Sequence, residues 1–174
     1  VYQDRGSAKI DLYPAAEAES KSTAHVEIPP TKQPVPFTLK TEFAGRQRIE
    51  AVGGGAVRVE WPEGRPMTIE SSFERPGELH GRWSLYFYVP KGTKLVGGFS
   101  EGVGKLLDAE GSLAHTFDNR PGHFSVPVPA GHDGRLWKFE FCAGDKMLMT
   151  VPPYLARSAE ELLLPKSVVE RDAK

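Results

Sequence analysis

The sequence predicts an all-β protein: an antiparallel β-sandwich of the jelly-roll or galactose-binding-like type, with a short C-terminal helix. Short apolar runs with period-two alternation recur about every 8–12 residues, a spacing typical of sandwiches and barrels. The 18 glycines and 15 prolines among 174 residues favour turns over long helices. No stretch before residue 155 has helical periodicity, so a parallel α/β sheet is not expected.

The length supports one sizeable core, so we expect a single sandwich domain over residues 1–174. Residues 152–174 are expected to form a proline-bounded helical extension of that domain. The chain begins at Val1 without an initiator Met. We therefore expect it to be excised from a larger protein.

Strands are expected wherever apolar and polar residues alternate between turn signals. In the first half these are Ala8–Tyr13, Thr23–Ile28, Phe37–Phe43, Ile49–Ala51, Val57–Trp61 and Met67–Ser71. We place the first two at the margin of a sheet. The prolines between residues 29 and 36 predict an extended loop, because proline cannot donate to a β-ladder.

Residues 82–90 form the central predicted strand. One face of it, with Trp83, Leu85, Phe87 and Val89, is wholly apolar and is expected to be core. The later strands are expected at Leu95–Phe99, Lys105–Asp108, Ser112–Phe117, Phe124–Val128, Leu136–Cys142 and Lys146–Val151, the last as a hairpin partner of the strand before it. Gly97 and Gly98 predict a bulge or a close backbone approach.

Pro152 and Pro153 are expected to end the sheet region. Ser158 stands three residues before Glu161, the spacing of a capping box, so a short helix is predicted to start there and to stop at Pro165. We expect this tail to pack on the sandwich, with contact to a neighbouring domain as the alternative.

The net charge of -1 argues against nucleic acid or an anionic membrane as a partner. No apolar run approaches the ~20 residues that span a bilayer. Cys142 is the only cysteine, which excludes an intrachain disulfide, and its apolar neighbours predict a buried, inert thiol.

No motif for a nucleophile, a phosphate loop or a helical zinc pair is present. Paired carboxylates could cleave a glycoside, and the candidates are Glu42, Glu50, Glu60, Glu70 and Glu140. These residues lie on the polar side of predicted strands, as on a solvated face. The turn aspartates Asp108, Asp118, Asp133 and Asp145 could hold a structural calcium, although Asp also favours turns by bonding to the backbone. No other cofactor is expected, and a metal site formed by histidines from different strands is left open.

Aromatic residues give the better functional prediction. Trp61, Trp83 and Trp137 are expected in the core, whereas Arg82, Tyr86 and Tyr88 share the second face of the central strand. Phenol rings beside a guanidinium suit a sugar, whose C–H face stacks on a ring. The same tyrosines could instead pack under a helix or another domain.

Four stretches carry a resemblance to a known group: Trp83–Lys94, Asp133–Lys138, Val151–Ala156 and Leu162–Pro165. Together they look like the C-terminal β-sandwich accessory domains of secreted bacterial glycan-degrading proteins. The resemblance covers about residues 80–165 and implies a secreted or periplasmic location. It also implies association with a glycoside hydrolase, a polysaccharide or oligosaccharide ligand, and a neighbouring domain.

We therefore expect a non-catalytic carbohydrate-binding or accessory module of an extracellular glycan-processing protein, with Arg82, Tyr86 and Tyr88 as ligand-binding residues. One alternative is a structural domain that docks a catalytic neighbour and has no small ligand. A second is a glycoside-active enzyme that uses strand carboxylates. We expect no catalysis by this chain alone.

Overall fold

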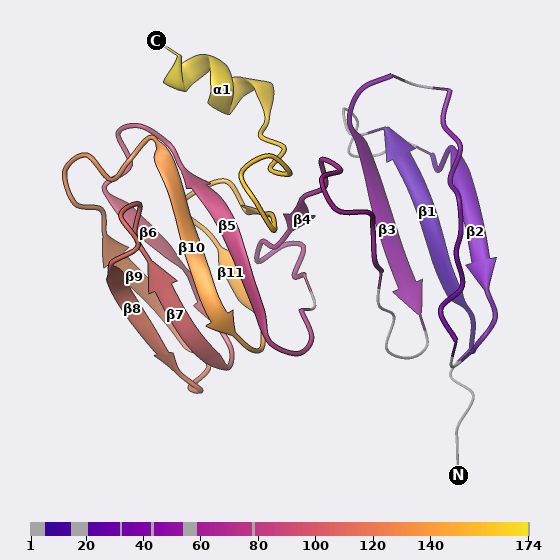
Figure 1. Cartoon of the computed structure of the whole chain (residues 1–174), viewed down its shortest axis with the longest axis horizontal. Helices are drawn as coiled ribbons and strands as arrows, with labels where there is room; N and C mark the ends of the chain where they lie inside the picture. The colour runs from indigo at the N-terminus through magenta and orange to yellow at the C-terminus, as the bar shows by residue number, and fades with distance from the viewer. Residues whose placement is uncertain are drawn as a thin grey trace. The chain divides into compact units, whose positions relative to one another are not determined.

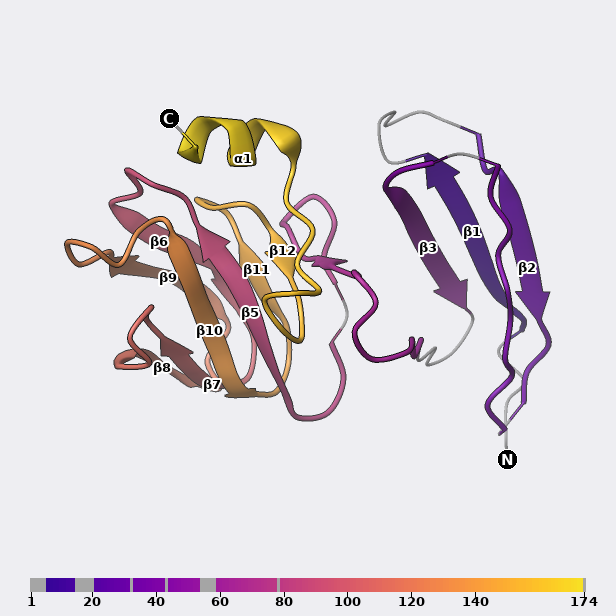
Figure 2. The same ribbon diagram turned by 45° about the horizontal axis from the view of Figure 1, so that its top comes forward.

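The computed structural model describes residues 6–14, 21–31, 33–42, 44–53, 59–77 and 79–173. Two compact units divide the chain, Val1–Trp61 and Pro62–Lys174. The described strands pair antiparallel, and one short helix follows them, so the predicted all-β fold with a C-terminal helix is confirmed (Figures 1 and 2). A single domain over residues 1–174 stays a prediction.

The first unit contains a three-stranded sheet in the order β2-β1-β3. Its strands are β1 (Ala8–Pro14), β2 (Ala24–Ile28) and β3 (Gln47–Gly53). Ile10 lies between Val26 and Ala51 in register and is buried. On the opposite face, Asp11 accepts a hydrogen bond from His25 at 2.9 Å. β2 lies at the edge of the sheet, as predicted. The same prediction is wrong for β1, which is the central strand because β3 pairs with its other side.

Two strands predicted in the first half are absent from the described residues. Residues 37–42 are irregular, although Phe37 and Leu39 are half-buried while Thr38 and Lys40 are exposed. Val59–Trp61 is likewise irregular, while Phe43 and residues 54–58 lie outside the described part of the chain. Alternation reports which side chains are covered. It does not guarantee that a partner strand lies alongside.

The second unit is a β-sandwich. Its larger sheet has the order β5-β10-β7-β8 and its smaller sheet the order β11-β6-β9. The larger sheet contains β5 (Trp83–Val89), β10 (Arg135–Cys142), β7 (Val103–Leu107) and β8 (Leu113–Asp118). The smaller contains β11 (Lys146–Leu148), β6 (Leu95–Ser100) and β9 (Gly122–Pro127). Phe87, Trp137 and Phe139 from the larger sheet pack with Val96 and Leu148 from the smaller one in a single core.

Trp137 is fully buried and Trp83 packs half-buried against the core, as predicted for both. Trp61, the third tryptophan expected in a core, is half-buried. The predicted buried thiol of Cys142 is also confirmed, and burial raises the pKa of this thiol above its ordinary value.

A pair of short strands links the two sheets along one edge. β12 (Tyr154–Leu155) pairs with β4 (Ile69–Glu70). Ala156 then exchanges backbone hydrogen bonds with Tyr86 of β5, and Ser71 accepts one from Leu148 of β11. The prediction that sheet structure ends at Pro152 and Pro153 is therefore wrong, because two residues without a free N–H can precede a strand that begins at Tyr154.

The predicted hairpin between the strands before and after Gly144 is also wrong. β11 pairs with β6 instead of β10, so the chain crosses from one sheet to the other between Cys142 and Lys146. The glycine pair in β6 keeps its register with β9, without a bulge. The predicted close approach is confirmed, because a Cβ on Gly98 would lie 2.0 Å from the Met147 carbonyl oxygen.

The C-terminal helix α1 spans Lys166–Asp172 and therefore starts after Pro165, not before it. Proline fits a helix start, where its φ of -57° suits the first turn and its missing N–H costs nothing. Glu161 does not cap a helix at Ser158, because its carboxylate binds Arg157 at 2.8 Å and the Gly64 N–H at 3.1 Å. No helix in the described part of the chain is long and apolar enough to cross a membrane.

Lys146 is the one charged residue at the centre of the crossing, and its exposed fraction is 0%. Its ammonium group donates to the carbonyl oxygens of Glu101 at 2.6 Å, Ala143 at 3.3 Å and Asp145 at 3.5 Å. It also lies 5.0 Å from the ring centre of Phe117 and 5.9 Å from that of Trp83. Burial lowers the pKa of Lys146 below its ordinary 10.5.

Replacing this ammonium tests its structural role. We expect Lys146→Met to lower the free energy of unfolding by about 1–3 kcal/mol, because the carbonyl groups lose a charged donor while the apolar volume is kept. Urea unfolding measures the difference. Lys105→Met, on an exposed lysine of β7, is the matched control and should change stability little. Equal stability of the two variants would contradict the role.

The pH dependence gives a second readout. Since the pKa of Lys146 is lowered in the folded state, the unfolded chain holds more protons than the folded chain between that pKa and 10.5. The free energy of unfolding contributed by Lys146 must therefore rise with pH across this window. We expect the stability difference between the natural protein and Lys146→Met to widen as the pH approaches 10.

Candidate functional site

The outer face of the larger sheet carries the best candidate site. We call it the β10 face and define it as Ser84 and Tyr86 of β5 with Lys138, Glu140 and Phe141 of β10. Lys138 lies opposite Tyr86 in register. No helix crosses this part of the sheet in either view of the ribbon (Figures 1 and 2).

A β-bulge turns Phe141 away from the core. The register between β10 and β5 shifts between Phe139 and Cys142, both of which are fully buried. Phe141 is 62% exposed. β10 has neighbours on both sides here, since Cys142 pairs with Trp83 and Ala143 bonds to Val103, so the exposed ring belongs to the outer face.

The backbone of Phe141 is strained. Its φ is 49°, in the left-handed region that bulky residues rarely occupy. The Ser84 hydroxyl supports this conformation by accepting a hydrogen bond from the Phe141 N–H at 3.0 Å. Strain of this kind persists where the surroundings impose it, and it is concentrated at functional sites. A large exposed ring in such a conformation is the least expected feature of the sheet.

The remaining residues of the β10 face form a polar pair beside a second ring. Lys138 Nζ lies 2.9 Å from Glu140 Oε1 and 5.6 Å from the ring centre of Tyr86. Tyr86 is two residues along β5 from Ser84, about 7 Å in an extended strand. The face therefore presents two aromatic rings with a hydrogen-bonding ion pair at their side.

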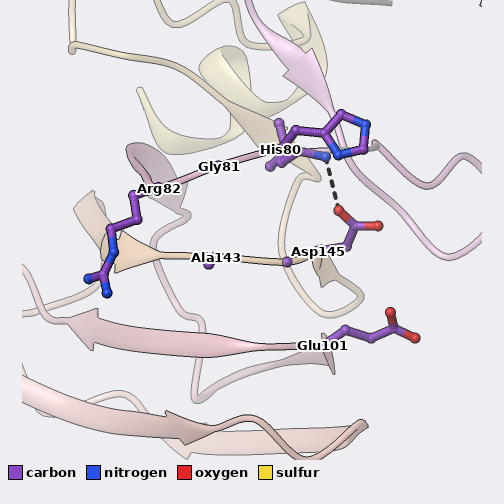
Figure 3. Close-up of a pocket in the computed structure, with 8 residues that line it drawn as sticks. His80, Gly81, Arg82, Glu101, Ala143 and Asp145 are labelled. Carbon is purple, nitrogen blue, oxygen red and sulfur yellow. Dashed lines mark hydrogen bonds between the residues drawn. The ribbon is translucent and has the colours of Figure 1, made fainter. Parts of the chain in front are cut away.

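Of the three ligand-binding residues predicted from the sequence, Arg82 is not among the residues that define the β10 face. It precedes β5 and lines a shallow, open depression together with His80, Gly81, Glu101, Gly144 and Asp145. In Figure 3 its guanidinium points away from His80 and Asp145, whose carboxylate accepts a hydrogen bond from the Leu79 N–H at 2.9 Å. That Arg82 and Tyr86 bind one ligand together stays a prediction.

Tyr88 packs under the C-terminal helix. Burial and a hydrogen bond to Asp172 raise the pKa of Tyr88 to about 12. Asp172 also accepts a hydrogen bond from the Lys91 N–H at 2.9 Å, and Arg171 Nε lies 3.3 Å from it. Burial alone would raise the pKa of Asp172, but these donors hold it below its ordinary value. For Tyr88 the packing alternative, a tyrosine under a helix, is the one observed.

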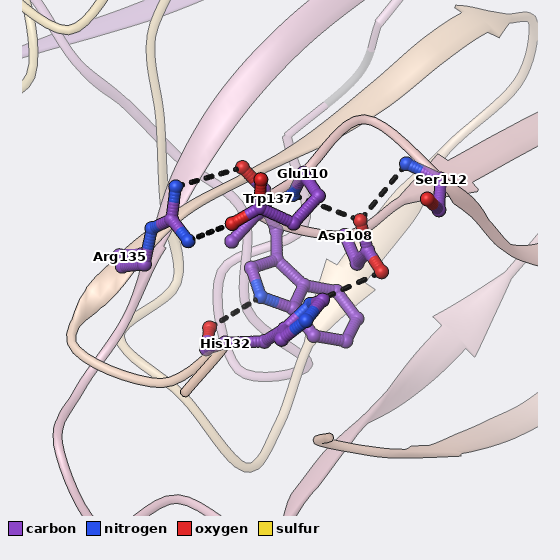
Figure 4. Close-up of polar contacts among 7 residues, drawn as sticks. Asp108, Glu110, Ser112, His132, Arg135 and Trp137 are labelled. Atoms are coloured by element: carbon purple, nitrogen blue, oxygen red, sulfur yellow. Dashed lines mark hydrogen bonds and ion pairs between the residues drawn. The ribbon is translucent and has the colours of Figure 1, made fainter. Parts of the chain in front are cut away.

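The turn aspartates that suggested calcium each bond to protein groups. Asp108 accepts hydrogen bonds from the N–H groups of Glu110 and Ser112, both at 2.9 Å (Figure 4). Its Oδ2 also lies 3.1 Å from His132 Nδ1, which is an ion-pair distance, but these two atoms do not have hydrogen-bond geometry. Asp133 accepts the Gly92 N–H at 2.7 Å, which lowers its pKa. Within the described ranges, no three His, Cys, Asp or Glu residues come together to hold a metal.

The predicted carboxylate candidates are likewise engaged with basic neighbours. Glu70 lies 3.5 Å from Arg75, Glu140 lies 2.9 Å from Lys138, and Glu50 pairs with Arg48. Glu42 and Glu60 belong to the first unit, outside the sandwich.

Sequence reasoning gave no role to Lys138 and Phe141, and it considered Glu140 only as a possible catalytic carboxylate. Strict alternation along Leu136–Cys142 would place Phe141 on the same face as Trp137 and Phe139, whereas the bulge removes it from that face. The sequence does contain a signal of this bulge. Phe141 and Cys142 are adjacent apolar residues at the end of an alternating run, so strict alternation had to fail at one of them.

Removing one hydroxyl tests the assignment of Tyr88. We expect Tyr88→Phe to loosen α1 by about 0.5–1.5 kcal/mol through loss of the bond to Asp172, seen as faster hydrogen exchange of the Val169 and Ala173 amides. Tyr86→Phe, on the same strand face, should not change that exchange. Since the pKa of Tyr88 is raised to about 12, its stabilisation is complete below pH 10 and is lost as the pH rises through 12.

Comparisons with known proteins identify no relative. No family model, no curated protein and no solved structure matches the chain. The resemblance to accessory domains of glycan-degrading proteins therefore stays a prediction, and function has to be argued from the β10 face itself.

Proposed function

We propose that this protein is a non-catalytic carbohydrate-binding module that binds an oligosaccharide or polysaccharide on the β10 face. The observation that carries this proposal is Phe141, a ring that is 62% exposed and held at a φ of 49°. An exposed apolar ring in a strained backbone gives no stability that a smaller residue would not also give. A ligand that stacks on the ring supplies a reason to keep it.

The chemistry of the face suits a sugar. The C–H face of a pyranose is apolar and packs on an aromatic ring, while its hydroxyl groups need donors and acceptors close to that ring. Phe141 and Tyr86 offer the rings. Lys138 offers a donor and Glu140 an acceptor, already fixed by their mutual contact at 2.9 Å. A purely apolar partner would leave this ion pair without hydration.

Binding without turnover follows from the single carboxylate of the β10 face. Glycoside hydrolysis needs two carboxylates on either side of the bond, about 5–10 Å apart. Glu140 is the only acid among the residues that define the face, and Lys138 neutralises it at 2.9 Å. Attachment to an extracellular glycan-processing protein, and a secreted or periplasmic location, are part of the same proposal.

The apolar residues of the tail are covered within the second unit and so do not call for a docking partner. Leu155 and Ala156 are buried, and Leu162–Leu164 are half-buried. The Leu163 N–H also donates to the Thr68 hydroxyl at 2.7 Å. The tail therefore covers its own sandwich.

Binding to polysaccharides tests the proposal. We expect retardation of the whole chain in native gels that contain one or more of xylan, hydroxyethylcellulose, laminarin, galactomannan or pectin. Phe141→Ala and Tyr86→Ala should each weaken that binding by about tenfold, equivalent to 1.4 kcal/mol. Leu113→Ala, which removes a side chain that is 60% exposed on β8, is the matched control. Retardation by none of the polymers, or unchanged binding in both ring variants, would overturn the proposal.

A pair of variants separates stability from function at the bulge. Glycine adopts a positive φ without the clash that any Cβ brings, so Phe141→Gly should be about 1 kcal/mol more stable than Phe141→Ala. Both variants lack the ring, and we expect both to bind polysaccharide equally weakly. Thermal unfolding measures the first comparison and gel retardation the second. If Phe141→Ala were the more stable of the two, the strain assigned to this position would be wrong.

A further inference from the structure

A second aromatic cluster lies on the opposite side of the sandwich. On the outer face of the smaller sheet, Phe99 of β6 pairs in register with His123 of β9 and Met147 of β11. Phe73, from the turn after β4, joins this row. We call the set Phe73, Phe99 and His123 the β6 cluster.

The three rings hold one another in place. The Phe73 and His123 rings are nearly parallel, with an interplanar angle of 22° and centres 6.4 Å apart. Phe99 meets both edge-on, at 6.2 Å from Phe73 and 5.4 Å from His123. Phe73 nevertheless remains 55% exposed. Its ring is therefore fixed from one side and open to solvent from the other.

Polar side chains belong to the same turn and to the strands beside it. His123 is an exposed residue whose ring nitrogens can donate and accept hydrogen bonds. The turn that carries Phe73 also carries Arg75, whose guanidinium lies 3.5 Å from Glu70. The arrangement repeats the elements of the β10 face: a supported exposed ring, a second ring and an ion pair.

One sugar ring cannot contact both aromatic sites. The β10 face and the β6 cluster belong to different sheets, and the core of Phe87, Trp137, Phe139 and Leu148 lies between them. Packed sheets are about 10 Å apart, so their outer faces are further apart still. Two sugar-binding surfaces placed in this way would bind two separate stretches of glycan.

We propose that the β6 cluster is a second sugar-binding site, with Phe73 as its stacking ring, and that the module is bivalent for glycan. This inference rests on the proposed function of the β10 face and extends it. A bivalent module would bridge neighbouring polysaccharide chains, and its apparent affinity for a polymer would exceed that of either site for a short oligosaccharide.

Stoichiometry tests bivalence directly. The probe is a hexasaccharide of whichever polysaccharide retards the whole chain most, titrated calorimetrically. We expect two molecules bound per chain, falling to one in Phe73→Ala and to one in Phe141→Ala. Leu113→Ala should keep two. Mixed with the parent polysaccharide, the natural protein should raise light scattering by cross-linking, and each ring variant should bind without doing so.

The outcomes separate the two proposals. If Phe141→Ala abolishes all binding and Phe73→Ala changes neither stoichiometry nor scattering, the β10 face is the single site and bivalence is wrong. If Phe73→Ala alone abolishes binding, the β6 cluster binds glycan and the function assigned to the β10 face is wrong. If Phe73→Ala instead changes the sedimentation coefficient without ligand, the β6 cluster is a contact between copies of the chain, which also overturns the inference.

Discussion

The buried ammonium group of Lys146 is the interaction on which the sandwich depends. Three carbonyl oxygens converge on it, and they come from two connections, Glu101 after β6 and Ala143 and Asp145 after β10. Carbonyl dipoles that point at one another repel unless a positive charge lies between them. A buried charge is in turn tolerated only when it is hydrogen-bonded. The ammonium group allows the three carbonyl groups to converge, and the carbonyl groups allow the ammonium group to be buried.

Two glycines allow these connections to come close enough for the contact. A Cβ on Gly102 would lie 2.1 Å from the Ala143 carbonyl oxygen, and one on Gly144 would lie 2.6 Å from that of Glu101. Both residues also have a positive φ. The same crossing brings Cys142 inward, where a Cβ on Gly104 would meet its Sγ at 2.3 Å. Phe139 and Cys142 both point inward, so Phe141 has to face outward together with Glu140. The constraint that closes the sandwich thus also exposes Phe141.

The sequence predicted the local parts of this structure better than their pairing. Alternation located β5, β6, β9 and β10 because each buries one face. It failed for residues 37–42, where burial alternates without a ladder, and it could not show that the strand after Gly144 pairs with β6. Pairing depends on contacts between residues far apart in the chain, and these leave no local pattern. The site shows the same limit. Alternation predicted that Tyr86 lies on the outer face of its strand, but the bulge at Phe141 and the helix over Tyr88 are consequences of tertiary structure.

If the β10 face binds glycan as proposed, the division of the β5 surface between helix and open sheet would also set the direction of the bound chain. At the Tyr88 end, Asp172 and Lys91 close the face beneath α1. The open part contains Tyr86 on β5 and Phe141 on the neighbouring strand β10. Lys105 of β7 lies opposite Glu140 in register and is exposed. Lys138, Glu140 and Phe141 follow one another along β10, with Tyr86 beside Lys138 on β5 and Lys105 beside Glu140 on β7. A chain of sugar rings that stacked on both Tyr86 and Phe141 would therefore have to lie diagonally over β5 and β10, with the Lys138 and Glu140 pair between the two rings.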